Sequence, residues 1–228
     1  SGDWSADNVY SWSTDGLAWT TSNAAPAFRA DDCVAAFGRF TCVRDRHLSW
    51  SDDGSSVVHE LDSGGAGSLY WSLAVLDDRV ITVGRTGRRS ISWDGLQWDE
   101  DAAGDMASGE ELFAVAAHGD TVVSVGGSNN LVVGTSHDRG VTWTDQVLLD
   151  AQYARFGSVV VHQGVFYAGA NNGGLGSTVL SSIDGDTWTP IPGAPVSSLL
   201  GSVNGVLLGV SNNWTANGSY AVLYTSPD

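Results

Sequence analysis

The feature that most constrains this chain is a short motif, Ser-x-Asp, which is followed by Gly in most copies and recurs at nearly even spacing. In its fullest form, a Trp comes a few residues after the Gly. The aspartates of the six copies are Asp15, Asp53, Asp94, Asp138, Asp184 and Asp228, at steps of 38, 41, 44, 46 and 44 residues. A repeat of this period predicts that the chain is an array of similar supersecondary units.

Each interval between motifs carries four short runs of β-branched and aromatic residues, separated by Gly, Asn and Asp. In one interval the runs are 69–76, 79–83, 89–93 and 96–99, with the motif between the third and fourth. Such runs predict four antiparallel strands, and the motif then forms a hairpin turn with Gly at a positive φ. We therefore expect an all-β fold, a β-propeller of four-stranded blades, as a single domain over residues 1–228.

The two ends of the chain carry incomplete repeats. Residues 8–19 match only the third and fourth strands of a blade, and residues 196–224 match the first three. A ring closes if the N-terminal outer strand completes the last blade, which removes the exposed sheet edges. This arrangement predicts five blades, and six blades are the alternative.

The Ser-x-Asp turns resemble the Asp-box (BNR-type) repeats of sialidases, sortilin-type receptors, photosystem II assembly factors and many secreted bacterial proteins. The resemblance covers nearly the whole chain and implies blades in which the box is structural and lies away from the ligand. Sialidases carry a Phe/Tyr-Arg-Ile-Pro segment before the first box, whereas Phe28-Arg29 is followed here by Ala30-Asp31. The resemblance therefore implies a fold and no particular activity.

Charge excludes two classes of partner. The chain has 26 acidic residues against ten basic ones, all of them Arg, and a formal net charge of −16. Such a charge repels nucleic acid and anionic membranes. No apolar run approaches the roughly 18 residues of a membrane span. A chain of this size also buries enough surface to fold with no cofactor, and none is expected.

The two cysteines flank a short predicted turn at residues 37–40. In a tight hairpin Cys33 and Cys42 lie nearly opposite each other, so a cross-strand disulfide is geometrically possible. A disulfide would fit an oxidising compartment and a secreted or cell-surface protein. Two buried free thiols are the alternative, and the spacing does not match a zinc knuckle.

Strand alternation sorts the loops into two faces. The loops joining strands two and three, and the links between blades, lie opposite the Ser-x-Asp turns. Seven of the ten arginines fall on that face, together with several amides and one loop Trp. The candidate ligand-binding residues are Arg29, Arg44, Arg85, Arg155, Asn129, Asn171 and Trp214. Arginine suits carboxylate or sulfate oxygens, and amides with Trp suit a sugar. The alternative is that the arginines pair with neighbouring acidic residues.

These observations predict a non-catalytic binding module that recognises a carbohydrate, with a glycan or an extracellular protein as partner. One alternative is a glycoside hydrolase, for which Asp105 with Glu110 and Glu111 offer carboxylates. The other is a protein-interaction scaffold. No metal site is expected, since His118 and His162 share a position in predicted turns where solvated side chains are the ordinary case.

Overall fold

The structure, a computed structural model, describes residues 10–13, 17–22, 31–44, 47–52, 59–62, 69–99, 110–150, 154–172, 177–194, 196, 198–215 and 218–226. Within these ranges the chain forms antiparallel strands and a single short 3-10 helix. The described residues include no helix of the length and apolarity that a membrane span requires.

The N-terminal part forms two sheets. The first is a pair, β1 (Tyr10–Trp12) and β2 (Thr20–Ser22). The second is four-stranded, in the order β3 (Asp32–Ala36), β4 (Arg39–Arg44), β5 (His47–Ser51) and β6 (His59–Asp62). In this second sheet Cys33 pairs directly with Cys42, and the two form a disulfide with a Cα–Cα distance of 4.1 Å.

The middle of the chain forms three sheets, each built by consecutive strands. The first has β7 (Tyr70–Leu76), β8 (Arg79–Gly84) and β9 (Arg89–Ser92), with the 3-10 helix η1 (Arg85–Gly87) between the last two. The second has β10 (Leu112–His118), β11 (Thr121–Gly126), β12 (Asn130–Ser136) and β13 (Thr144–Asp150). The third has β14 (Ala154–His162), β15 (Val165–Asn172), β16 (Ser177–Ser182) and β17 (Thr189–Ile191). The predicted repeat of four antiparallel strands is thus present in the second and third of these sheets, and β9 is followed by an isolated bridge between Ile91 and Asp99.

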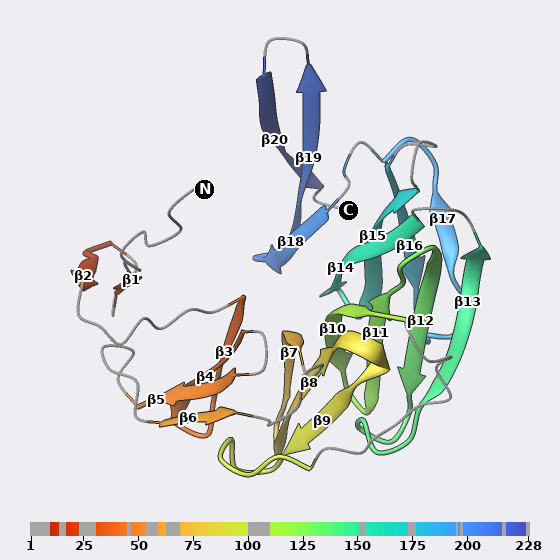
Figure 1. Ribbon diagram of the computed structural model, residues 1–228. Helices are drawn as coiled ribbons and strands as arrows, with labels where there is room; N and C mark the ends of the chain where they lie inside the picture. The colour runs from red at the N-terminus through yellow and green to blue at the C-terminus, as the bar shows by residue number, and fades with distance from the viewer. Residues whose placement is uncertain are drawn as a thin grey trace, which may run out of the picture.

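The last sheet has three strands, β18 (Ser198–Val203), β19 (Val206–Thr215) and β20 (Gly218–Ser226). The predicted closure by the N-terminal outer strand is not confirmed. In the described residues β1 pairs with β2, and β20 pairs with β19. Figure 1 shows the sheets following one another along an arc that is open between β20 and β1.

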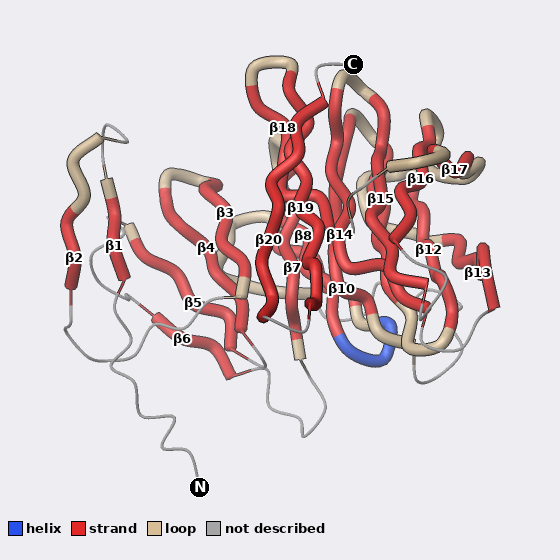
Figure 2. Tube along the Cα trace, turned by 90° about the horizontal axis from the view of Figure 1, so that it is seen from above, coloured by secondary structure: helices blue, strands red, loops and turns tan. Residues whose placement is uncertain are grey.

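From β3 onward, the arc places the first strand of each sheet next to the first strand of the following one, in the order β3, β7, β10, β14 and β18. The loops gather at the two ends of the strands, and η1 lies at the end opposite the C-terminus (Figure 2). One end carries the Ser-x-Asp turns and the turns between first and second strands; this is the turn end. The other end carries η1, the loop between β11 and β12, and the starts of the first strands; this is the ladder end.

The hydrophobic core lies between successive sheets. The largest cluster joins β10–β13 to β14–β17 and includes Phe156, Phe166, Val123 and Val133, which are at most 1% exposed. Similar clusters fill the other three interfaces from β3–β6 to β18–β20. This packing is the reason the strands alternate in burial only weakly, since a sheet between two others buries both faces.

Side-chain oxygens also link the first strands to one another. The backbone N–H of Leu73 donates to Asp32, that of Val115 to Ser72, and that of Leu199 to Ser158, over 2.8, 3.3 and 2.8 Å. These bonds satisfy donors on strands that have no strand partner on that side. The corresponding position in β10 is Ala114, whose side chain has no oxygen to accept such a bond.

Candidate functional site

The Ser-x-Asp turns are held by a repeated set of hydrogen bonds. In the 136–143 turn, Ser136 donates to Asp138 (2.7 Å), and the N–H of Gly140 donates to Ser136 (2.8 Å). The N–H and hydroxyl of Thr142 donate to the same carboxylate, over 2.8 and 2.6 Å. The turns at Ser92-Trp93-Asp94-Gly95 and Ser182-Ile183-Asp184-Gly185 repeat the serine and aspartate bonds.

These bonds shift the titration of the three carboxyl groups in one direction. The N–H of Gln97 donates to Asp94, and the N–H of Thr187 to Asp184, which lowers both pKa values below the ordinary 3.8. For Asp138, burial acts to raise the pKa, but the donated hydrogen bonds outweigh it and the pKa is lowered. All three groups are therefore ionised hydrogen-bond acceptors at neutral pH.

The turn at residues 182–185 also packs against the preceding sheet. Gly185 has a φ of +86°, and a Cβ there would lie 2.8 Å from Thr135, whose hydroxyl donates to the Gly185 carbonyl. Trp188 then donates its indole N–H to the same carbonyl at 2.7 Å, as Trp143 does to Gly140 at 2.8 Å. The turn end is thus built from groups that already have partners, which is the chemistry of a scaffold.

The ladder end carries a different repeated feature, a β-bulge at the start of the first strand. The pairing register shifts by one residue at the same position in four successive sheets. The extra residues are Trp71, Phe113, Gly157 and Leu200. A bulge re-aims the side chain of its extra residue and is frequent beside binding sites.

Two of the bulge residues and one arginine form a row across three sheets, the aromatic ladder of Trp71, Phe113 and Arg155. The rings of Trp71 and Phe113 stack with centroids 4.9 Å apart and planes inclined by 15°. The Arg155 guanidinium lies over the Phe113 ring, 5.5 Å from its centroid. Both rings are partly exposed and Arg155 is exposed, so the row is accessible at the surface.

Acidic residues flank the ladder but are engaged with neighbours. Arg85, in η1, pairs with Glu111 at 3.7 Å, and both side chains are partly exposed. Glu110 accepts hydrogen bonds from the N–H of Ser128 (3.0 Å) and from the Asn130 amide (2.6 Å). These contacts fix the loop between β11 and β12 beside the ladder.

Arg89 belongs to the core, although its sequence position placed it beside a loop of the predicted ligand face. Its side chain is fully buried and makes a bidentate ion pair with Asp145, with an N–O distance of 3.2 Å for one of the two contacts. It also donates to Ser124 and lies 4.2 Å from the centroid of the Trp143 ring. Its acidic partner is 56 residues away in the chain, so it is not one of the neighbouring acidic residues that the sequence suggested; such a pair is seen instead between Arg85 and Glu111.

The structure brings only some of the predicted ligand residues together. Arg155 is part of the aromatic ladder, Arg85 lies in η1 at the same end, and the exposed Asn129 lies in the loop between β11 and β12. Arg44 ends β4 and Asn171 lies near the end of β15, while Trp214 is part of β19, where it pairs with Ser219, and not of a loop. Arg29, Asp15, Asp53 and Asp228 lie outside the described residues.

Sequence reasoning missed the two rings of the ladder and misjudged one histidine. The available signal was the spacing, since Phe113 follows Trp71 by 42 residues and Arg155 follows Phe113 by another 42. His162, expected to be solvated, is 2% exposed and bonded to Ser202 at 2.8 Å, because β18 packs over it. The described residues contain no cluster of three or more groups that could hold a metal ion.

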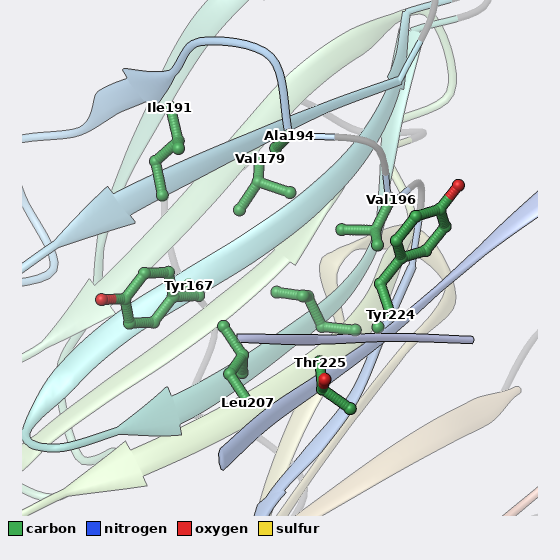
Figure 3. A pocket seen from close by; sticks show the side chains of 10 residues that line it. Tyr167, Val179, Ile191, Ala194, Val196, Leu207, Tyr224 and Thr225 are labelled. Atoms are coloured by element: carbon green, nitrogen blue, oxygen red, sulfur yellow. The ribbon is translucent and has the colours of Figure 1, made fainter. Parts of the chain in front are cut away.

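An apolar pocket of about 330 Å³ lies between the sheets β14–β17 and β18–β20. Figure 3 shows Tyr167 and Leu207 on one side of it, with Val196 and Tyr224 on the other. No charged residue lines the pocket, and Val196 and Leu207 belong to the core between these sheets. Its lining is mostly apolar, with hydroxyl groups from Tyr167, Tyr224 and Thr225, and it lies within the packing between these two sheets.

Comparison with known proteins agrees with the architecture. The DUF6242 beta propeller domain matches residues 92–224, which is more than half of the chain. No curated protein matches it.

Similar solved structures include one described as "YCF48 bound to D1 peptide" (TM-score 0.56, 14% identity, 78% of this chain and 61% of that one). Others are the WD40 beta propeller domain of Doa1 (0.55, 12%, 80% and 62%) and the computationally designed Ika8 protein (0.54, 14%, 86% and 61%). The chain thus spans about three fifths of the length of these structures, and at such identities the likeness shows the fold alone.

Proposed function

This chain belongs to the DUF6242 beta propeller domain family, and from that premise we propose that it is a non-catalytic binding module that takes a carbohydrate at the ladder end. The observation that carries the proposal is the row formed by Trp71, Phe113 and Arg155. Aromatic rings pack against the apolar face of a sugar, and a guanidinium donates to its oxygens.

The proposal also fixes the finer features of the architecture. The Ser-x-Asp turns are Asp boxes, supported by the bonds shared by Asp94, Asp138 and Asp184. The sheet β18–β20 is the first three strands of a fifth blade, which the N-terminal outer strand completes. The protein is secreted or displayed at the cell surface, a location supported by the Cys33–Cys42 disulfide.

The state of the nearby carboxylates favours binding over hydrolysis. A glycoside hydrolase needs two carboxyl groups that are free to act on the glycosidic bond. Glu110 already accepts two hydrogen bonds, and Glu111 pairs with Arg85. Both groups are thus used to hold loops.

A second candidate is the binding of a peptide, as in a protein-interaction scaffold. It is supported by the likeness to the structure described as YCF48 bound to a D1 peptide. A partly exposed aromatic row with an adjacent Arg also suits a peptide, since aromatic and Arg residues dominate protein interfaces.

The test is a glycan array probed with the purified protein and with Phe113→Ala. We expect the wild type to bind, and the variant to bind about tenfold more weakly because one stacking face is removed. The matched control is Trp93→Ala, which removes a 49% exposed Trp from the turn end. That variant should bind as the wild type does.

An array that stays blank with folded protein would contradict the carbohydrate proposal, and peptide binding would then lead. Equal losses for Phe113→Ala and Trp93→Ala would place the binding site away from the ladder. Thermal unfolding of each variant establishes that a loss of binding is not a loss of fold.

A further inference from the structure

The row of aromatic bulge residues, Trp71 and Phe113, stops at the third sheet. The bulge residue is Trp71 in the first of four successive sheets, Phe113 in the second, Gly157 in the third and Leu200 in the fourth. Trp71 stacks on Phe113. Where the next side chain would continue the row, glycine supplies none.

The space beside Gly157 is open. A Cβ built on this residue would meet no atom of another residue within 4 Å, apart from its chain neighbours, and Gly157 itself is exposed. Its φ does not fall in the left-handed region, so the backbone does not require glycine here. Leu200, the bulge residue of the following sheet, is 59% exposed. The gap is therefore flanked by an aromatic side chain in the preceding sheet and an aliphatic one in the following sheet.

Arg155 supplies charge at the same place, two residues before Gly157 on β14. Among the described arginines, Arg39, Arg79, Arg85, Arg89 and Arg139 each have a carboxylate within 4 Å. Arg155 is exposed and has no carboxylate partner in the described part of the chain; its contact is with the Phe113 ring. In a chain with 26 acidic residues, an exposed arginine that is left without one is available to an anionic ligand.

We infer that the space over Gly157 is a subsite for the ring of an acidic sugar, a hexuronic acid, whose carboxylate binds Arg155. This inference rests on the proposed carbohydrate-binding function and names its ligand class. The sugar ring takes the place of the missing third side chain, beside Arg155, whose guanidinium lies over the Phe113 ring. The net charge of −16 disfavours polyanions, so the ligand carries one carboxylate among neutral sugars.

The experiment measures binding of two probes by calorimetry. One is a neutral oligosaccharide ending in glucuronic acid, and the other is the same molecule with that carboxylate reduced to an alcohol. The wild type should bind the acidic form about tenfold more tightly, the usual value of one charge-assisted contact. Arg155→Gln should remove this preference, so that the variant binds the two probes with equal affinity.

A second variant tests the space itself. Gly157→Phe supplies the third side chain of the ladder and should abolish binding of both probes while the protein stays folded. Gly157→Val, a smaller block, serves if the Phe variant does not fold, and should weaken both probes. Arg39→Gln, which removes one charge at the turn end, is the control and should leave both affinities unchanged.

The outcomes separate this inference from the proposed function. Equal binding of the two probes by the wild type, or unchanged binding by a folded Gly157→Phe variant, would overturn the subsite and leave carbohydrate binding in place. If neither probe nor any array glycan binds, the proposed function fails as well. Binding of a peptide with a free C-terminal carboxylate, with no sugar bound, would assign the same site to a peptide ligand and overturn both.

Discussion

The turn end and the ladder end are built by the same repeats but differ in what the repeats keep constant. At the turn end Asp94, Asp138 and Asp184 accept the same hydrogen bonds in three sheets. At the ladder end the equivalent bulge positions hold an indole, a phenyl ring, a glycine and a leucine. A feature kept in every repeat serves the fold that all repeats share, whereas a position that changes between repeats is available for a ligand.

The same contrast holds between two arginines in neighbouring parts of the molecule. Arg89 is fully buried, paired with Asp145 and stacked near Trp143. Arg155 is exposed, and its guanidinium lies over the Phe113 ring. Identical side chains thus serve as an interior tie in one interface and as a surface donor in the next.

The largest expected effect is at the interior tie. Arg89→Gln removes the partner of Asp145, a carboxylate whose side chain is 7% exposed, and leaves that charge buried and unpaired. We expect the free energy of unfolding to fall by about 3–5 kcal/mol, as measured by urea denaturation. A loss below about 1 kcal/mol would mean that water reaches this pair and that Arg89 contributes no more to stability than a surface arginine does.

The next effect is at the turn end. Asp138→Ala removes the acceptor of bonds from Ser136 and Thr142 and should cost about 1–2 kcal/mol, as the loss of a helix N-cap does. Chemical denaturation measures the change. Ligand affinity should stay as in the wild type, and a loss of affinity without a loss of stability would place function at the turn end.

A smaller effect on stability is expected when the pH is lowered. Because the folded pKa values of Asp94, Asp138 and Asp184 lie below 3.8, these groups bind fewer protons in the folded state than in the unfolded one. Their contribution to stability is fully present above the unfolded pKa of about 4 and is lost as pH falls through the folded values. Melting temperatures between pH 6 and pH 2.5 should fall less steeply for Asp184→Asn than for the wild type. Parallel curves would show that the turn carboxylates do not contribute.

The smallest effect on stability is expected at the ladder end. Arg155→Gln should change the free energy of unfolding by no more than about 0.5 kcal/mol, the usual range of exposed positions. The substitution is the same as at Arg89, so the pair of measurements compares two environments with one chemical change. A loss as large as that at Arg89 would show that Arg155 is a structural residue.

Much of the scaffold could be predicted because local rules decide it. The spacing of Cys33 and Cys42 around a short turn predicted that they lie opposite each other, and in the structure they are paired between β3 and β4. Ser, Asp and Gly at fixed offsets predicted the hairpin turns, because those side chains bond to the backbone only a few residues away. The blade order followed, since consecutive strands pair with one another.

The candidate site was harder to predict because it depends on contacts between repeats. A bulge leaves no signature in residue alternation, so Trp71 and Phe113 read as ordinary strand residues. Position in a loop did not distinguish Arg89, which enters the core, from Arg85, which does not. His162 is buried by Ser202 and the rest of β18, 40 residues further along the chain, and no local pattern carries that information.

The hydrogen bonds that link the first strands have a mechanical consequence. Asp32, Ser72 and Ser158 each hold the strand that follows, whereas Ala114 provides no such hold on β14. The sheets β10–β13 and β14–β17 are therefore held together by the largest core cluster and by hydrogen bonds from Thr135 and Gln146 to the backbone carbonyls of Gly185 and Asp186. Phe113 and Arg155 stand on opposite sides of that interface. A molecule held by both would add a second link between these two first strands, beside the contact that the Phe113 ring already makes with Arg155.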